Sequence, residues 1–150
     1  MEDTQSTNIG IVAINEIEYS HVKFQPESFN SDNLFFGFQF GLNPNYEANQ
    51  IGILLDVSYN YKLAENEIEN FKILNLKLET IFSVSDLSIT FDERSGKPFH
   101  RRNEELLATL LGIALSTFRG YLYLKSAGTS VRELFFPILN PLEIIRDIKD

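Results

Sequence analysis

The sequence predicts an α+β fold, with a four-stranded antiparallel sheet followed by a long helix and a short C-terminal helix. Two observations carry this prediction. Four runs within the first 84 residues alternate, at least loosely, between the two faces of a strand, as half-buried strands do. After residue 103 the chain continues as one long apolar helical stretch. Strands first and helices last is the order of an α+β chain.

The four expected strands are separated by short polar connections, which favours an antiparallel meander. In the third strand, every second position from Ile51 to Tyr61 is apolar or aromatic, whereas the positions between them are mostly polar. This strand therefore predicts a sheet with one apolar face and one largely wet face. The four ranges are Asn15–Gln25, Leu34–Asn43, Ile51–Leu63 and Phe71–Val84.

The helices have recognisable start signals. Asn103 is a suitable N-cap for the long helix, and two glutamates follow it in the first turn, where the helix dipole favours negative charge. Gly128 is a natural helix stop. Asn140 and Pro141 open the last helix as cap and first residue. The segment Asp92–Arg102 before the long helix is expected to be a solvated basic loop, with docking to an acidic partner as the alternative.

Composition limits the class of protein. The chain has 150 residues, of which 43% are hydrophobic and none is cysteine. We expect a single domain over residues 1–150, with the polar residues 1–8 disordered. The absence of cysteine excludes disulfides and thiolate metal sites and fits a cytoplasmic protein. The net charge of −8 argues against nucleic-acid binding. No signal peptide is expected, because the N-terminus has acidic residues where a signal peptide would carry bases. No membrane span is expected, because the apolar run Leu106–Leu115 is short.

The residue pattern offers little chemistry. The two histidines, His21 and His100, lie far apart and belong to no metal-ligand spacing. No phosphate-binding glycine loop, nucleophile motif or calcium loop is present in the sequence. We therefore expect no enzyme activity, no catalytic residue, no metal and no cofactor.

A strip of small residues along the long helix predicts an assembly. The small residues recur at every fourth position, a spacing that keeps them on one narrow face. Glycine in a helix interior costs about 1 kcal/mol relative to alanine, so close packing against another helix should offset it. The predicted oligomer interface is Ala108, Gly112, Ser116 and Gly120.

Phenylalanines gather on the second strand, where Phe36, Phe38 and Phe40 share one face. The third strand alone already provides a full apolar face, and one helix covers only part of such a sheet. The apolar side chains that one helix cannot cover predict either burial in an oligomer or a groove open to other polypeptides.

Several local strings resemble the SecB-type export chaperones and their SecB-like relatives. The resemblance covers the chain from Glu16 onward. IEYSHVKFQPE is similar to the first strand of that family, and LETIFSVSDL is similar to the end of its fourth strand. GYLYLKSAGT followed by FFPILNPLEII resembles the exit from the long helix, the crossover and the short last helix.

This resemblance implies ATP-independent holding of unfolded polypeptides in apolar grooves, by a homo-oligomer built as a dimer of dimers. The client-binding residues that it implies are Phe36, Phe38, Phe40, Phe135, Leu142 and Ile145. In export chaperones of the family, acidic residues on the outer sheet face dock the translocation motor. The corresponding positions here are His21, Gln25 and Asn75, none of which is acidic. Docking to the motor is therefore in doubt.

Three further functions stay open from the sequence. A SecB-like chaperone dedicated to one client, such as an antitoxin, would bind no motor. A binder of one small apolar ligand would enclose it against the phenylalanine-rich sheet. A purely structural subunit would use every apolar patch as an interface. Only a holdase predicts broad binding that grows with the length of the unfolded client.

Overall fold

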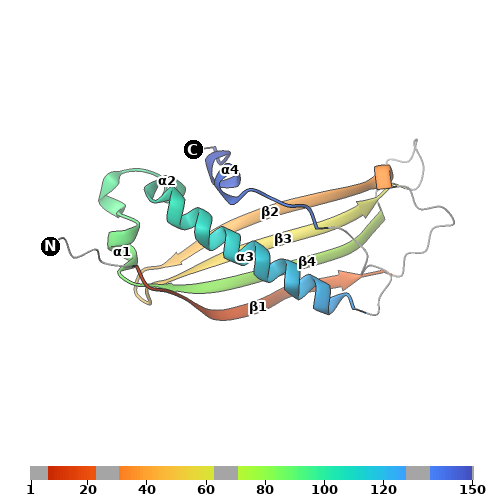
Figure 1. Cartoon of the computed structure of the whole chain (residues 1–150), viewed down its shortest axis with the longest axis horizontal. Helices are drawn as coiled ribbons and strands as arrows, with labels where there is room; N and C mark the ends of the chain where they lie inside the picture. The colour runs from red at the N-terminus through yellow and green to blue at the C-terminus, as the bar shows by residue number, and fades with distance from the viewer. Residues whose placement is uncertain (1–6, 23–30, 63–70, 128–135, 150) are drawn as a thin grey trace.

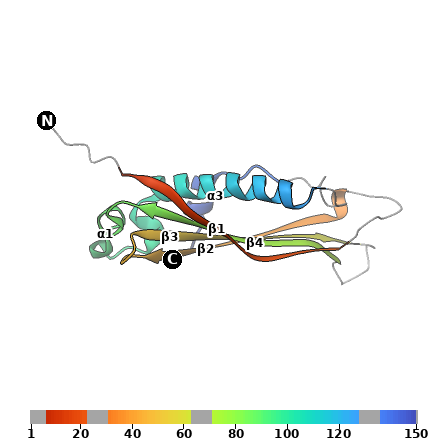
Figure 2. The same cartoon turned by 90° about the horizontal axis from the view of Figure 1, so that it is seen from below.

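A four-stranded antiparallel sheet carries a long helix on one face, and no described element covers its other face (Figures 1 and 2). The computed structural model describes residues 7–22, 31–62, 71–127 and 136–149. The strands are β1 (Ile9–His21), β2 (Leu34–Asn45), β3 (Gln50–Tyr61) and β4 (Phe71–Val84). The predicted fold class, including the order of sheet and helices, is confirmed.

The order of the strands differs from the predicted meander. Strands β2, β3 and β4 are consecutive neighbours, but β1 pairs with β4, so the order across the sheet is β1-β4-β3-β2. The first two strands therefore form opposite edges (Figure 1). Strands that follow one another in sequence are neighbours only about two-thirds of the time, and the alternation within a strand does not encode its partner. The meander was wrong for β1.

Strand β1 begins six residues earlier than predicted, at Ile9. Its register against β4 shifts twice, between Ile11 and Ala13 and between Glu16 and Glu18. Each extra residue of such a bulge reverses the face on which the following residues lie. The alternation in the sequence was therefore interrupted. Directly before β1, the main-chain N–H of Asn8 donates to Ser85 Oγ at 3.0 Å.

The core lies between the sheet and the helix. All six apolar and aromatic residues of β3 that were predicted to share a face are buried. On β4, the buried residues at alternate positions from Leu74 to Val84 continue the same face. The opposite positions of β3 are mostly polar and partly exposed. The predicted difference between an apolar and a wet face is confirmed.

The helices are α1 (Leu87–Thr90), α2 (Phe99–Arg102), α3 (Glu104–Lys125) and α4 (Pro141–Arg146), and two 3-10 turns are η1 (Ser31–Asn33) and η2 (Glu93–Ser95). The expected loop Asp92–Arg102 thus contains η2 and α2. Its basic residues are partly structural, because the Arg102 side chain donates to the Lys97 carbonyl at 2.8 Å and to the Tyr46 hydroxyl at 3.1 Å. The prediction of a solvated loop is therefore only partly right for this segment.

Helix α3 starts as predicted. The Asn103 side chain accepts a hydrogen bond from the Leu106 N–H at 3.3 Å, which satisfies one of the free donors of the first turn. The helix ends at Lys125, before Gly128, which lies outside the described residues. Its buried face points at the sheet and consists of Leu107, Leu110, Leu111, Ala114, Leu115, Phe118 and Leu122.

Candidate functional site

Three phenylalanines of β2 form a ladder on the helix-covered side of the sheet. Phe36, Phe38 and Phe40 lie opposite buried residues of β3. Their neighbouring rings are stacked, with centroids 6.4 Å apart for Phe36 and Phe38 and 6.2 Å apart for Phe38 and Phe40. All three are only half-buried, because β2 is an edge strand. The structure therefore brings these three predicted residues together as one aromatic ladder.

Phe136 packs against this ladder, and the sequence analysis missed it. Its ring lies edge-on to Phe36, with centroids 5.7 Å apart, and its centroid is 5.5 Å from that of Phe118. The Arg119 guanidinium stands 5.3 Å from the same ring, a cation–π geometry. The sequence analysis chose Phe135, which lies outside the described residues. Two adjacent phenylalanines point different ways in an extended chain, so the sequence could not distinguish them.

Helix α4 lies on the same side of the sheet as the aromatic ladder and Phe136. Its start matches the prediction, since Asn140 Oδ1 accepts from the Leu142 N–H at 3.1 Å and Pro141 follows the cap. The two predicted residues of α4 differ in accessibility: Ile145 is fully buried, whereas Leu142 is half-buried. Ile145 therefore packs into the core of this chain, and only Leu142 presents surface.

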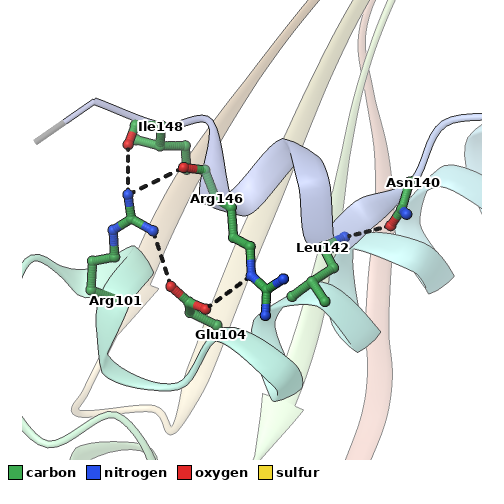
Figure 3. Close-up of polar contacts among 6 residues, drawn as sticks. All are labelled: Arg101, Glu104, Asn140, Leu142, Arg146 and Ile148. Carbon is green, nitrogen blue, oxygen red and sulfur yellow. Dashed lines mark hydrogen bonds and ion pairs between the residues drawn. The ribbon is translucent and has the colours of Figure 1, made fainter.

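A polar network fastens α4 to the start of α3 (Figure 3). Arg101 donates to Glu104 Oε1 at 3.0 Å and, through its other terminal nitrogen, to the carbonyls of Arg146 and Ile148, both at 3.2 Å. Arg146 Nε lies 3.5 Å from the second oxygen of Glu104. The hydrogen bond from Arg101 is the main reason why the pKa of Glu104 is lowered. One carboxylate therefore links α2, α3 and α4.

The strip of small residues on α3 is divided by this packing. A Cβ added to Gly112 would lie 3.4 Å from Pro141 Cγ, whereas one added to Gly120 would meet nothing within 4 Å. Ala108 is half-buried against the core and Ser116 is exposed. Within this chain, Pro141 of α4 thus packs against α3 at Gly112 and leaves room for a Cβ in ordinary contact. In the described part of the chain, Ser116 is exposed and nothing packs against Gly120.

Strand β1 exposes apolar side chains along a sheet edge. Ile9, Ile11, Val12, Ile14 and Ile17 are between 36% and 55% exposed. The stretch Ile9–Asn15 contains no charged residue and no proline, the usual devices that protect an edge strand from pairing. This uncharged edge was missed, because the sequence analysis began the strand at Asn15.

The other half of β1 is tied to the end of α3. Glu16 accepts from the Tyr121 hydroxyl at 2.9 Å and pairs with Lys125 Nζ at 3.1 Å. The Lys125 ammonium also lies 5.1 Å from the centroid of the Tyr19 ring. The hydrogen bond from Lys125, followed by that from Tyr121, lowers the pKa of Glu16. Because the bulge after Glu16 reverses the pleat, both Glu16 and Tyr19 face the helix.

The three predicted motor-docking positions do not form one surface. His21 lies opposite Leu74, a core residue, and its ring centroid is 5.5 Å from that of Tyr19. Asn75 lies opposite Ser20 and Ser58 on the bare face of the sheet. Gln25 lies outside the described residues. His21 and Asn75 are thus on opposite faces, since directly opposed residues in an antiparallel pair share a face.

The described residues contain no cluster of three or more histidines or carboxylates that could hold a metal ion. Among them, the most strongly shifted phenol is Tyr59, whose pKa is raised by burial beneath the helix. Tyr19 differs, because its hydroxyl is the one buried side-chain polar atom of the described chain that has no hydrogen-bond partner.

Comparison with known proteins places the fold. The structure is similar to that of the Mycobacterium tuberculosis Rv1957 SecB-like chaperone, which was solved in complex with a ChAD peptide from the Rv1956 HigA1 antitoxin. The superposed region covers 87% of this chain and 90% of the Rv1957 chain. The TM-score is 0.55 and the sequence identity is 11%. The fold is SecB-like. No family model and no curated protein matches the sequence, so the likeness is one of structure.

Helix α3 in this SecB-like fold is apolar enough to be compared with a membrane span. In the described part of the chain it is the one helix that meets the requirements of length and composition. Core helices of water-soluble proteins meet the same requirements. Here one face of α3 packs on the sheet, which accounts for much of its apolar character.

Proposed function

We propose that the protein is an ATP-independent holdase that binds unfolded polypeptides on the aromatic ladder of β2. The observation that supports this best is that Phe36, Phe38 and Phe40 stack in a row yet stay half-buried at a sheet edge. A row of partly exposed rings offers repeated apolar contacts with no demand on sequence. The same fold occurs in a SecB-like chaperone that was solved with a bound antitoxin peptide, which supports the same function.

The segment before α4 adds apolar surface beside the ladder. Phe136 contacts Phe36, and two residues further along Ile138 is 87% exposed. Leu142 at the start of α4 is half-buried. An extended client lying along β2 would meet these side chains in addition to the ladder. Several weak contacts acting together would make affinity rise with client length.

The test is light scattering of a chemically unfolded client diluted into buffer, with and without the protein and without ATP. We expect the wild type to suppress aggregation and the variant Phe38→Ala/Phe40→Ala to lose most of that effect. Phe35→Ala is the matched control, because Phe35 lies on the same strand, is exposed and faces the opposite side of the sheet. Equal suppression by the ladder variant and the wild type would refute the proposal.

A chaperone dedicated to one client is the second candidate. It is favoured by the separation of His21 and Asn75 on opposite faces, which leaves the implied motor-docking positions without a common surface. The neighbour of the same fold was solved with an antitoxin peptide. A dedicated chaperone would hold one polypeptide tightly and leave unrelated unfolded clients to aggregate. Comparing several unrelated clients in the scattering experiment distinguishes the two candidates, and pull-down of the motor tests an export role.

We infer that the protein acts as a homo-oligomer, with a dimer of dimers as the expected form. Two surfaces support this. One is the uncharged edge Ile9–Asn15 of β1, with its exposed isoleucines. The other is the exposed face of α3 around Ser116 and Gly120, where a Cβ added to Gly120 would meet nothing within 4 Å among the residues that the structure describes. A structural subunit or a binder of a small apolar ligand would share these surfaces but would not hold unfolded clients.

A further inference from the structure

A row of small side chains crosses the bare face of the sheet. Gly37 on β2 lies opposite Ser58 on β3, Ser58 lies opposite Asn75 on β4, and Asn75 lies opposite Ser20 on β1. Directly opposed residues share a face, so these four residues form a line at right angles to the strands. We call this line the transverse trough.

Larger side chains flank the trough and give it depth. On one side, Gln39 and Asp56 are opposed in the next row, and Lys77 continues it. Lys72 lies in the row on the other side. The hollow between them has a volume of about 370 Å³. A Cβ added to Gly37 would lie only 2.5 Å from Ser58 Oγ, so the absence of a side chain at Gly37 keeps the floor open.

Asn75 lies on the floor of the trough with its hydrogen-bonding capacity unused. The residue is only 4% exposed, and its side chain makes no hydrogen bond to any residue in the described part of the chain. The neighbouring Ser58 Oγ accepts from Asn60 Nδ2 at 3.4 Å, so its own hydroxyl hydrogen remains to donate. An amide offers two donors and a carbonyl acceptor, and those of Asn75 are not sealed from solvent, since the Tyr19 hydroxyl is the one buried side-chain polar atom without a partner in the described chain. Asn75 lines the hollow, so its unmet donors and acceptor are accessible from there.

We propose that the transverse trough binds the main chain of a short extended polypeptide segment, with Asn75 and Ser58 as its hydrogen-bonding floor. A peptide group presents one N–H and one C=O, which complement the carbonyl and amino groups of an asparagine side chain. The residues that line the hollow come from β2, β3 and β4. Two strand spacings of about 4.8 Å make this part of the trough about 10 Å long, which is about three residues of extended chain at 3.4 Å each.

The charges along the trough favour an uncharged main chain over a charged ligand. Asp56 and Lys72 line it with opposite signs, so neither an anion nor a cation gains from both. This site differs from the aromatic ladder in chemistry and in position, since Gly37 and Phe38 point to opposite faces of β2. It goes beyond the proposed holdase function and does not depend on it, because a structural subunit could bind a partner segment here equally well.

The test is an NMR titration of the full-length protein with acetyl-tetraglycine amide, a peptide that has a main chain and no side chains. We expect millimolar binding, with the largest shift changes at the Asn75 side-chain amide and at the backbone amides of Gly37 and Ser58. A peptide of equal length with N-methylated glycines lacks the main-chain donors and should bind at least about fivefold more weakly. Absence of localised shifts would mean that Asn75 is merely hydrated and would overturn the proposal.

Two variants keep the test decisive. Asn75→Leu removes the amide at similar volume, and Ser58→Val fills the floor with a side chain that strands favour. Each should weaken tetraglycine binding by at least about fivefold. Asn15→Leu is the control, because Asn15 lies opposite Glu79, outside the trough, and should bind as the wild type. Unchanged binding in a folded Asn75→Leu or Ser58→Val protein would refute the site. Client holding on the ladder is measured separately by light scattering.

Discussion

Gly112 of α3 and Pro141 of α4 are neighbours: a Cβ added to the glycine would lie 3.4 Å from Cγ of the proline. The ring thus rests on the helix at the one position of that turn without a side chain. Because α4 carries Ile145 into the core and lies beside the extended chain that positions Phe136, this contact sets where the C-terminal part of the molecule can sit.

Substitutions at Gly112 should separate helix propensity from helix packing. Alanine makes only ordinary van der Waals contact with Pro141 and gains up to about 1 kcal/mol of helix propensity, so Gly112→Ala should be neutral or stabilising. Gly112→Leu must displace α4 and should lower the free energy of unfolding by about 1–3 kcal/mol. Urea unfolding measures both. Thr109→Leu, at an exposed position of the same helix, should be nearly neutral, and an equal loss there would contradict the packing argument.

The carboxylate of Glu104 should make the attachment of α4 dependent on pH. Its pKa lies below the usual value of 4.5, chiefly because of the hydrogen bond from Arg101. A depressed native pKa adds stability above the pKa of the unfolded chain, and that stability is lost as the pH falls through the native pKa. The wild type should therefore be more stable than Glu104→Gln at pH 7, and the difference should shrink as the pH falls below the unfolded pKa of about 4.3 and vanish below the lowered native pKa. A difference independent of pH would exclude this role for the charge.

The hydroxyls of Tyr19 and Tyr121 should have opposite effects on stability. The Tyr19 hydroxyl is buried without a partner in the described chain, so Tyr19→Phe removes an unsatisfied group and should raise the free energy of unfolding by about 1 kcal/mol. Tyr121 donates to Glu16 at 2.9 Å, so Tyr121→Phe should lower stability slightly. Paired thermal and urea unfolding of the two variants checks the sign. Loss of stability in Tyr19→Phe would reveal a partner for its hydroxyl.

The sequence predicted most of the fold because β3, β4 and both main helices carry strong local signals. The run Ile51–Tyr61 alternates without interruption, and Asn103 and Asn140 cap their helices as expected. Strand β1 has no such signal. Its two register shifts break the alternation, and its partner β4 is distant in sequence. Pairing between distant strands depends on tertiary packing, which a local pattern does not record.

The sequence predicted the part of the candidate site that consists of one residue type at alternate positions of one strand. The three phenylalanines of the ladder share a face by simple alternation. Phe136 was not distinguishable from its neighbour, and the burial of Ile145 depends on how α4 docks. Gly112 is a second example of a residue whose partner the sequence could not identify. Its glycine signals close packing, but only the structure identifies α4 of the same chain as the element that packs there.

The two exposed surfaces that support the oligomer can be tested separately. Ile11→Lys places a charge in the uncharged edge of β1, where charge opposes strand pairing. Gly120→Leu places a large side chain on the open half of the helix strip, where a second helix would need close approach. In a dimer of dimers, each variant breaks one kind of interface, so each should leave dimers, and the double variant should leave monomers. Size-exclusion chromatography with multi-angle light scattering measures the masses.

Ile89→Lys is the control for the oligomer variants, because Ile89 is as apolar as Ile11 and is 69% exposed on α1, outside both surfaces. It should keep the mass of the wild type. If Gly120→Leu keeps that mass and Ile11→Lys does not, the edge of β1 is the interface, and the strip has its partner in α4 alone. If the wild type is a monomer, neither surface is an oligomer interface. The apolar edge of β1 would then be available to clients, as an addition to the aromatic ladder.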